Sequence, residues 1–146
     1  MVSYSYPFDF QRTPKFFDRW NVDFKVEEFN TSNNFEFVIS DFNPTNIDEC
    51  VDATGKLNED NVHIVQTLPC SLIWDTDGGT ANLIRLREAV TWNIGDNNYY
   101  IKGLFLRHRN SGFVMGYSIN ISTAFNVNNT FTFDKDILIW SFVDGV

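Results

Sequence analysis

Residues able to act as general bases or nucleophiles are few and scattered along the chain. Histidine occurs only at His63, within a strand-like alternation, and at His108, at a predicted hairpin tip where we expect a solvated side chain. The sequence has no Gly-x-Ser-x-Gly turn, and its glycines form neither a Walker loop nor a dinucleotide-binding fingerprint. Covalent catalysis requires a nucleophile, a base and a group that orients the base. We therefore predict that the protein is not an enzyme and binds no cofactor.

Metal ligands are equally sparse. Cys50 and Cys70 lie far apart, without Cys-x-x-Cys or His-x-x-x-His spacing, so we predict no metal site and two reduced thiols. Residues 75–79, Asp-Thr-Asp-Gly-Gly, are similar to the start of a calcium loop. However, Thr80 stands where such a loop needs glycine, and Leu86 stands where it needs a bidentate acid. Asp-Gly between strands is a common hairpin turn, which we predict here, with a surface ion at the two aspartates as the alternative.

Two further residue classes could bind or cleave a sugar. A pair of carboxylates for glycoside hydrolysis is recognised by its separation in space, and the 19 acidic residues offer no particular pair. The four tryptophans are candidates for a sugar-stacking platform. Three of them, Trp74, Trp92 and Trp140, lie in strand-like apolar runs, so we expect core packing.

The elements that must position these side chains are predicted to be short strands. Phenylalanine supplies 15 residues and aromatic residues reach 16%, while asparagine stands mostly between apolar runs. Aromatic side chains favour pleated surfaces, and Asn and Asp tolerate the left-handed backbone of tight turns. The composition therefore indicates an all-β protein.

Alternation of apolar and polar residues locates several strands. The predicted strands cover residues 35–39, 62–68, 83–90, 99–107, 113–119, 131–133 and 137–143. A short helix is an alternative for residues 83–90, and residues 99–107 and 113–119 are expected to pair as a hairpin. Strands at this spacing are typical of a sandwich, a jelly roll or a small barrel. We predict a single antiparallel β-sandwich, or jelly-roll, domain.

Two segments depart from this rhythm. Residues 1–20 alternate aromatic with polar or small residues, but Pro7 and Pro14 interrupt a central strand, so we predict an extended aromatic arm. Such an arm needs an apolar surface, which is either the domain's own core or a neighbouring subunit. Residues 41–61 are acidic and rich in turn formers, which predicts a long loop with one helical turn near 47–53. The β domain then comprises residues 21–146.

The charge balance limits the classes of partner. Eleven Lys and Arg against 19 Asp and Glu give a formal charge of −8. A protein that coats DNA or RNA needs clustered cations, so we predict no nucleic-acid partner. No apolar run reaches the roughly 20 residues that span a bilayer. The first residues lack the basic and apolar regions of a secretory signal, and we expect neither membrane contact nor export.

The last part of the chain follows one pattern, in which an alternating strand and a polar turn precede a Gly-apolar-Phe-Leu strand, a Gly-containing hairpin and a final apolar strand. The residues that carry it are 90–96, 102–107, 111–119, 125–127, 130–133 and 137–140. In this pattern residues 89–143 resemble small accessory virion structural proteins of tailed bacteriophages, such as head decoration proteins, head-fibre proteins and small neck or tail components.

The resemblance implies a jelly-roll or β-sandwich component of the virion, assembled in the host cytoplasm. Its role would be non-enzymatic: to decorate or stabilise the capsid, or to anchor head fibres or tail parts. Its partners would be further copies of the chain, with a trimer favoured, and virion proteins such as the major capsid protein. Net negative charge would repel packaged DNA and fits the outside of a capsid.

The aromatic arm supplies the predicted interface, because aromatic side chains anchor protein–protein contacts. Its candidate contact residues are Tyr4, Tyr6, Phe8, Phe10, Phe16, Phe17 and Trp20. The alternative function is a carbohydrate-binding β-sandwich that acts as a receptor-binding module, which needs at least two exposed, coplanar tryptophans. A small glycan-cleaving enzyme is the third hypothesis, and it needs two facing carboxylates in a groove.

Overall fold

Strands dominate the chain. The computed structural model describes residues 2–5, 9–20, 29, 31–42, 44–77, 79, 81–119 and 121–144. Within them, two four-residue α-helices, α1 (Phe16–Arg19) and α3 (Ile47–Cys50), accompany the strands. The all-β prediction is confirmed.

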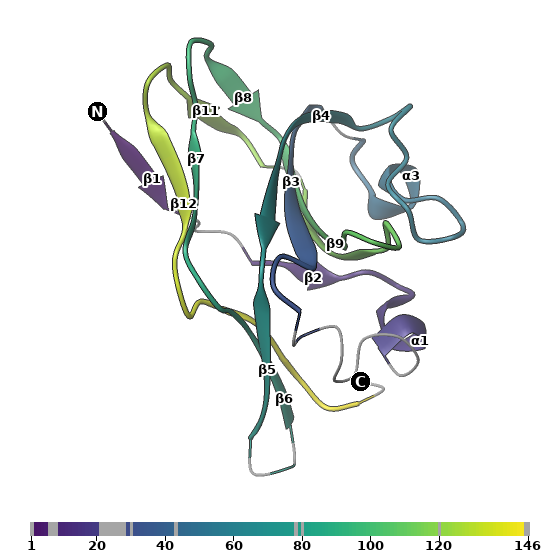
Figure 1. Cartoon of the computed structure of the whole chain (residues 1–146). Coiled ribbons are helices and arrows are strands. Elements are labelled where there is room, and N and C mark those ends of the chain that lie inside the picture. The colour runs from purple at the N-terminus through teal and green to yellow at the C-terminus, as the bar shows by residue number, and fades with distance from the viewer. Residues whose placement is uncertain are drawn as a thin grey trace.

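The strands of these residues form several sheets (Figure 1). They are β1 (Ser3–Ser5), β2 (Gln11–Arg12), β3 (Phe35–Phe42), β4 (His63–Cys70), β5 (Leu72–Asp77), β6 (Ala81–Leu86), β7 (Val90–Asn93), β8 (Tyr99–Ile101), β9 (Gly103–His108), β10 (Val114–Ser118), β11 (Thr123–Phe125), β12 (Thr130–Phe133) and β13 (Leu138–Phe142). The sheet orders are β1-β12-β7, β2-β10-β9-β3-β4, β11-β8 and β13-β6-β5. Residues 83–90 therefore begin as strand β6, not as a helix.

The predicted turns lie between these strands. Gly112 has a φ of 76° in the β9–β10 hairpin, and Asn128 and Asp136, with φ of 61° and 67°, occupy the turns before and after β12. These are the residue types that adopt left-handed backbone at low cost. The hairpin predicted for residues 99–107 and 113–119 is confirmed as β9 paired with β10, although its first strand divides into β8 and β9.

The five-stranded sheet separates two hydrophobic clusters, because successive residues of a strand point to opposite faces. On β3, Phe35 and Phe37 belong to one cluster and Val38 to the other. We call the first the inner cluster; its largest fully buried side chains are Phe16, Trp20, Phe35, Phe37, Phe113, Phe125, Phe131 and Phe133. We call the second the outer cluster; its buried members are Val38, Cys50, Leu57, Val62, Phe105 and Val114.

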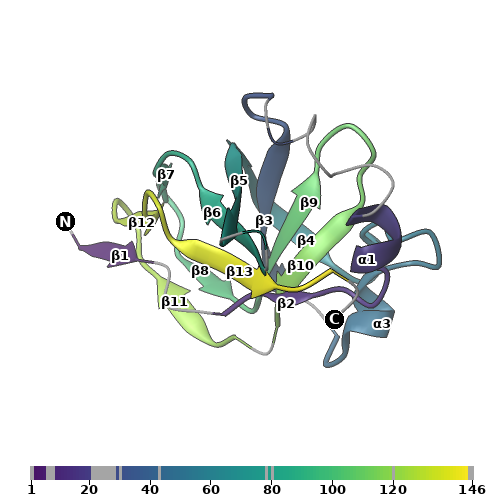
Figure 2. The same cartoon turned by 90° about the horizontal axis from the view of Figure 1, so that it is seen from below.

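Strand β13 packs against the inner cluster, and its end lies beside β2 (Figure 2). The indole Nε1 of Trp140 donates a hydrogen bond of 3.0 Å to the carbonyl of Phe10. The same ring lies against Gly116 of β10, where an added Cβ would stand 2.3 Å from Trp140 Cζ2. Glycine is therefore required at position 116 for β13 to pack this closely.

The predicted loop at residues 41–61 folds over the outer cluster. Strand β3 extends to Phe42, and one helical turn follows as α3, close to where it was predicted. Asn46 caps this helix, since its side chain accepts a hydrogen bond of 2.9 Å from the backbone N–H of Asp48. Isolated β-bridges join Val51 to Leu57 and Lys56 to Phe113, the residue before β10. We call residues 44–62 the cover segment.

The described part of residues 1–20 lies against the domain (Figure 1). Strand β2 pairs antiparallel with β10, and β1 pairs with β12 in parallel. The prediction of purely antiparallel pairing is therefore wrong at this edge. The parallel register, Ser3 opposite Thr130, joins segments from the two ends of the sequence.

Candidate functional site

Three of the seven predicted contact residues in the N-terminal segment lie inside the domain. Phe10, Phe16 and Trp20 belong to the inner cluster, with exposed fractions of 7%, 0% and 0%. Tyr6 and Phe8 lie outside the described residues. The chain itself covers the three buried rings, so an interface role for them requires the segment to leave the domain.

The burial of Trp20 has a clear physical basis. Its indole stacks on Phe16, with ring centroids 5.8 Å apart and planes at 14°. Its Nε1 donates a hydrogen bond of 2.9 Å to Oδ1 of Asp144. A buried indole N–H needs such an acceptor, and the acceptor comes from the residues after β13. The two ends of the chain thus hold each other in place.

The half-buried members of the same set are Tyr4 and Phe17. The Tyr4 ring lies 4.8 Å from the ring of Phe125, and β1 is an edge strand of its sheet. The Phe17 ring lies 4.9 Å from the guanidinium carbon of Arg12, which is also 5.0 Å from the Phe142 ring. Burial lowers the pKa of the Arg12 guanidinium from its ordinary value. Tyr4 and Phe17 are the predicted residues that retain some accessible surface.

A cavity of about 240 Å³ lies between the N-terminal segment and the cover segment, and we call it the α3 pocket. Its apolar lining comes from Pro14, Ile47, Val51, Ala53, Gly55 and Phe113, and its polar lining from Thr13, Lys15, Asp48 and Asp52. Two hydrogen bonds fix its N-terminal wall. Thr13 Oγ1 donates to the carbonyl of Val114 at 2.8 Å, and Lys15 Nζ donates to the carbonyl of Ala53.

The floor of the α3 pocket depends on a glycine. Gly55 has a φ of 86°, and an added Cβ would lie 2.4 Å from Cε2 of Phe113. The ring of Phe113 is only 1% exposed, so it cannot retreat without disturbing the inner cluster. Val114 N donates to the carbonyl of Gly55 at 2.8 Å, which ties the floor to β10. The pocket is therefore a built part of the fold.

The rim of the α3 pocket is acidic. Asp52 Oδ1 accepts hydrogen bonds from the hydroxyl of Thr54 at 2.6 Å, from the backbone N–H of Lys56 at 3.1 Å and from the backbone N–H of Thr54 at 2.8 Å. These bonds, the hydroxyl bond foremost, lower the pKa of Asp52 below its usual value. The lining contains two carboxylates, of Asp48 and Asp52, and one ammonium, of Lys15, while the charge of Lys56 also acts on Asp52. The pocket suits an apolar group that carries a cation beside it.

A second cavity, of about 480 Å³, lies at the β5–β6 hairpin, and we call it the Trp74 cavity. A hydrogen-bond network runs along its wall. Trp74 Nε1 donates to Asn82 Oδ1 at 2.7 Å, and Asn82 Nδ2 donates to Asp144 Oδ1 at 2.7 Å. Thr76 and Val143 are among its other lining residues. The cavity thus combines one aromatic ring with hydroxyl, amide and carboxylate groups.

The tryptophans lie mainly in the core. Trp20 is fully buried, Trp92 and Trp140 are each 6% exposed, and Trp74 is half-buried. The core packing predicted for Trp92 and Trp140 is confirmed, whereas Trp74 retains an accessible part. The chain therefore lacks the two exposed, coplanar tryptophans of a stacking platform.

The two histidines occupy unlike places. His108 was expected to be solvated, but it is 4% exposed, and its ring lies 5.7 Å from the ring of Phe35. The expectation is wrong because β9 continues through residue 108 and turns this side chain onto the core. His108 Nδ1 lies 2.8 Å from Ser111 Oγ, within the hairpin turn. His63 is exposed, and its Nδ1 lies 2.7 Å from Asp41 Oδ1.

Both cysteines are free and buried, in different clusters. Burial, helped by the neighbouring charge of Glu49, raises the pKa of Cys50 to about 11. Burial likewise raises the pKa of the Cys70 thiol. A thiol in such surroundings remains protonated and unreactive at neutral pH.

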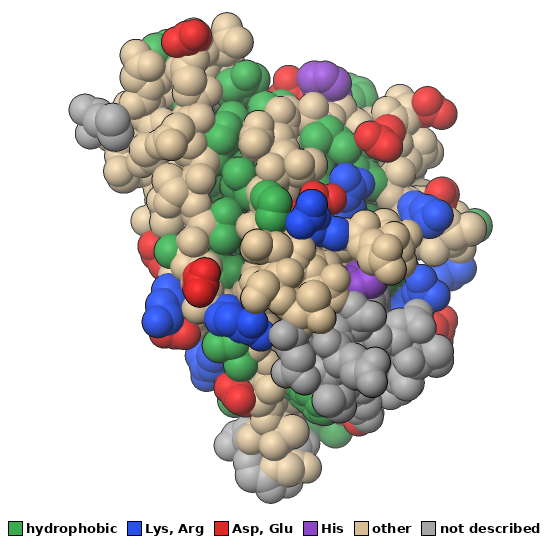
Figure 3. Space-filling model, in the orientation of Figure 1, with side chains coloured by type: hydrophobic (Ala, Val, Ile, Leu, Met, Phe, Trp, Pro, Cys, Tyr) green, Lys and Arg blue, Asp and Glu red, His purple; other side chains and the backbone are tan. Residues whose placement is uncertain are grey.

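Apolar side chains also reach the surface. The large ones exposed among the described residues are Val2, Phe42, Tyr100, Val127, Leu138 and Val143. Figure 3 shows a further apolar band over the space between β7 and β4. Val65 and Val90, on these two strands, are half-buried and pack against the inner cluster.

Metal ligands are not gathered in the part of the chain that the structure describes. There, no group of three or more His, Cys, Asp or Glu side chains is placed to hold an ion. Asp75 lies exposed on β5, and Gly78 and Thr80 of the calcium-like stretch fall outside the described ranges. Nor do those ranges contain a helix with the length and apolarity needed to cross a membrane.

Sequence reasoning missed the α3 pocket. Lys15 was placed in an arm and Asp48 and Asp52 in a loop, and only the fold brings these segments together. The usable signal was the acidic character of residues 41–61, combined with Gly55 in their midst.

Comparisons with protein-family models, with curated proteins and with solved structures found no match to this chain.

Proposed function

We propose that the protein is a non-enzymatic structural protein of a tailed-phage virion, which decorates or stabilises the capsid or anchors head fibres or tail parts. Its partners are further copies of the chain, as a trimer, and other virion proteins such as the major capsid protein. The proposal includes a single β-sandwich of jelly-roll type as the architecture, and the virion as the location.

The observation that carries this proposal is the α3 pocket. Its volume of about 240 Å³ lies below the roughly 300–1,000 Å³ that is typical of small-molecule sites. An apolar cavity of this size, with a charged rim, matches a single side chain supplied by another protein. The exposed rings of Phe42 and Tyr100 add surface groups of the kind that anchor interfaces. Contact with other proteins is therefore the activity that this surface supports best.

The test is to purify virus particles from a culture in which the protein is produced and to search these particles for the protein. Immunogold labelling with an antibody against the purified chain would place it on the head, neck or tail, and mass spectrometry of the same particles would give its copy number. We expect labelled particles and many copies per virion. Finding the protein only among unassembled material of the lysate would overturn the proposal.

A carbohydrate-binding, receptor-binding module is the second candidate, and the Trp74 cavity favours it. Sugar sites combine an apolar ring with a few convergent polar groups, and Trp74, Thr76, Asn82 and Asp144 supply both kinds here. This form of the hypothesis uses one partly exposed tryptophan in place of the two that were expected.

A glycan array distinguishes the second candidate from the first. The wild type and a Trp74→Phe variant would be compared with Thr91→Ala, an exposed change on β7 away from the cavity. Binding of one glycan class that is lost in Trp74→Phe and kept in Thr91→Ala would establish it. Absence of binding by the wild type, or equal binding by all three, would remove it.

A further inference from the structure

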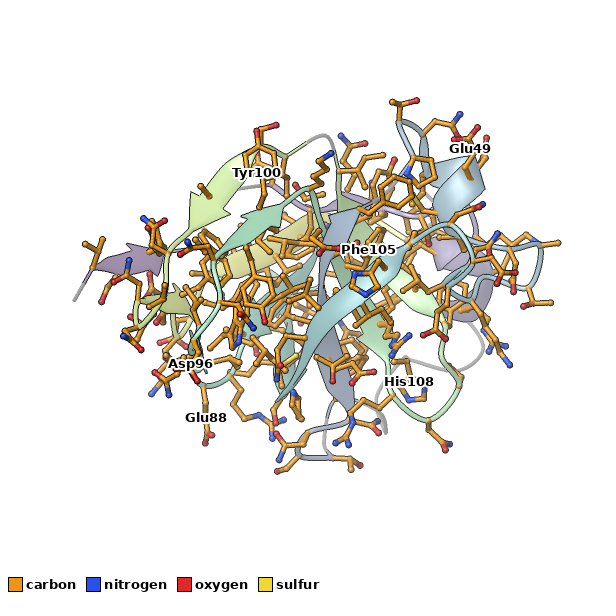
Figure 4. All side chains as sticks on the ribbon, turned by 90° about the horizontal axis from the view of Figure 1, so that it is seen from above. Glu49, Glu88, Asp96, Tyr100, Phe105 and His108 are labelled. Carbon is orange, nitrogen blue, oxygen red and sulfur yellow. The ribbon has the colours of Figure 1, made fainter. Side chains whose placement is uncertain are left out.

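One exposed aromatic side chain carries a cation beside it. Tyr100 on β8 is 51% exposed, and Lys102 Nζ lies 5.9 Å from the centre of its ring. Figure 4 shows Tyr100 on one side of the molecule and Glu49, on α3, on the other. The chain therefore presents an aromatic ring with a positive charge at one side, and an acidic apolar cavity at the other.

These two features are complementary. The α3 pocket offers the side chains of Ile47, Val51 and Phe113 to a ring, and the carboxylates of its rim to a cation. Phe42, the other strongly exposed ring, is a poorer match. It follows Asp41, whose carboxylate lies 2.7 Å from His63 Nδ1. If Phe42 entered the α3 pocket, the carboxylate of Asp41 would be repelled by the carboxylates of Asp48 and Asp52.

We propose that one chain inserts Tyr100, flanked by Lys102, into the α3 pocket of a second copy. This inference rests on the proposed function, because it names the contact by which copies of an assembly protein join. Donor and acceptor are different surfaces, so each chain carries one of each and the contact is heterologous. Such contacts close into a ring when the rotation allows, and a trimer is a small ring of this kind.

The first experiment measures mass by light scattering over a range of protein concentration at low salt. The wild type, Tyr100→Ser and Ala53→Phe would be compared with Phe42→Ser. Ala53 is exposed at the pocket, so the larger ring blocks the entrance without entering the core. Phe42 is as exposed as Tyr100 and is the matched control. We expect an oligomer for the wild type and Phe42→Ser, and at least tenfold weaker association for the other two.

Mixing the two defective variants gives the sharpest outcome. Ala53→Phe keeps its Tyr100, and Tyr100→Ser keeps an open α3 pocket. A heterologous contact therefore predicts a one-to-one complex in the mixture that grows no further, although each variant alone is a monomer. An isologous interface, in which the same patch meets itself, would give no such rescue.

A charge exchange tests the role of Lys102. Asp48→Lys and Lys102→Glu should each weaken association, and the double variant should recover most of it. A wild type that stays monomeric, a Tyr100→Ser variant with unchanged mass, or a mixture without a complex would each overturn the inference. A monomer that is still found on particles would overturn this contact and leave the proposed function standing. An oligomer that is absent from particles would overturn the proposed function and leave the contact standing.

Discussion

The two hydrophobic clusters on either side of the five-stranded sheet are built in different ways. The inner cluster is rich in aromatic rings, and Phe37 stacks on Phe133 with centroids 3.8 Å apart and planes at 1°. Its members come from strands along the whole chain. The outer cluster contains one phenylalanine, Phe105, and one stretch of chain, the cover segment, lies over it.

The difference indicates that the inner cluster stabilises the fold and that the outer cluster supports the segment that forms the α3 pocket. Rings contributed by distant segments can pack only when the whole topology has formed, so the inner cluster defines the fold. The cover segment has its own local contacts, α3, the bridge between Val51 and Leu57 and turn hydrogen bonds, and a few bonds from residues 53–56 attach it to the N-terminal segment and to β10. Loops supported by a rigid scaffold are where binding sites usually lie, and the α3 pocket is in such a place.

The largest expected effect comes from adjacent residues of β3 that face opposite clusters. Phe37 and Val38 are both fully buried. Phe37→Ala should cost about 3–5 kcal/mol, because it leaves a large cavity among stacked rings. Val38→Ala removes two carbons from the outer cluster and should cost about 1.6 kcal/mol. Chemical denaturation followed by circular dichroism measures both values.

The pair remains informative if Phe37→Ala does not fold. Phe37→Leu, which keeps a branched side chain of moderate volume, then replaces it in the same comparison. A loss for Val38→Ala as large as that for the Phe37 variant would contradict the view that the inner cluster dominates stability.

Local features of the fold could be predicted from the sequence because they depend on neighbours in the chain. The alternation of residues 35–39 predicts β3, and the turn at 109–112 predicts the β9–β10 hairpin. The burial of His108 could not be predicted, since it depends on Phe35, far away in the sequence. The α3 pocket is of the same kind, because Lys15 and Ala53 meet only through the fold.

An intermediate effect is expected at the cover segment itself. Leu57 is a buried member of the outer cluster, and Leu57→Ala should cost about 2 kcal/mol, at the low end for such a change, because a local cover can collapse onto the space. Hydrogen exchange should show the amides of residues 50–62 opening much more often than in the wild type. The amides of β3 and β9 should change only by the loss in global stability.

That pattern separates a local cover from an integral layer of the core. Equal acceleration of exchange through the cover segment, β3 and β9 would mean that the cover unfolds only with the whole domain. The contrast between the two clusters would then be one of composition alone.

The smallest effect is expected at Asp52, on the rim of the α3 pocket. Asp52→Asn keeps an acceptor oxygen for the N–H groups of Thr54 and Lys56 but removes the charge. The pKa of Asp52 is lowered in the folded state, so its contribution is present above the unfolded value of about 3.9 and is lost as pH falls through the folded pKa. Wild type and variant should therefore differ slightly at neutral pH and converge in acid.

Melting temperatures at several pH values between 7 and 2.5 measure this convergence, with Asp96→Asn, an exposed aspartate between β7 and β8, as the control for removing one negative charge. A gap between wild type and Asp52→Asn that widens on acidification would contradict the lowered pKa. The expected small effect also contrasts with the large loss of stability expected for Phe37→Ala in the inner cluster. Asp52 shapes a turn through its hydrogen bonds and adds little to global stability, so it can be changed for binding at small cost, whereas Phe113, which also lines the pocket, is a buried ring of the inner cluster.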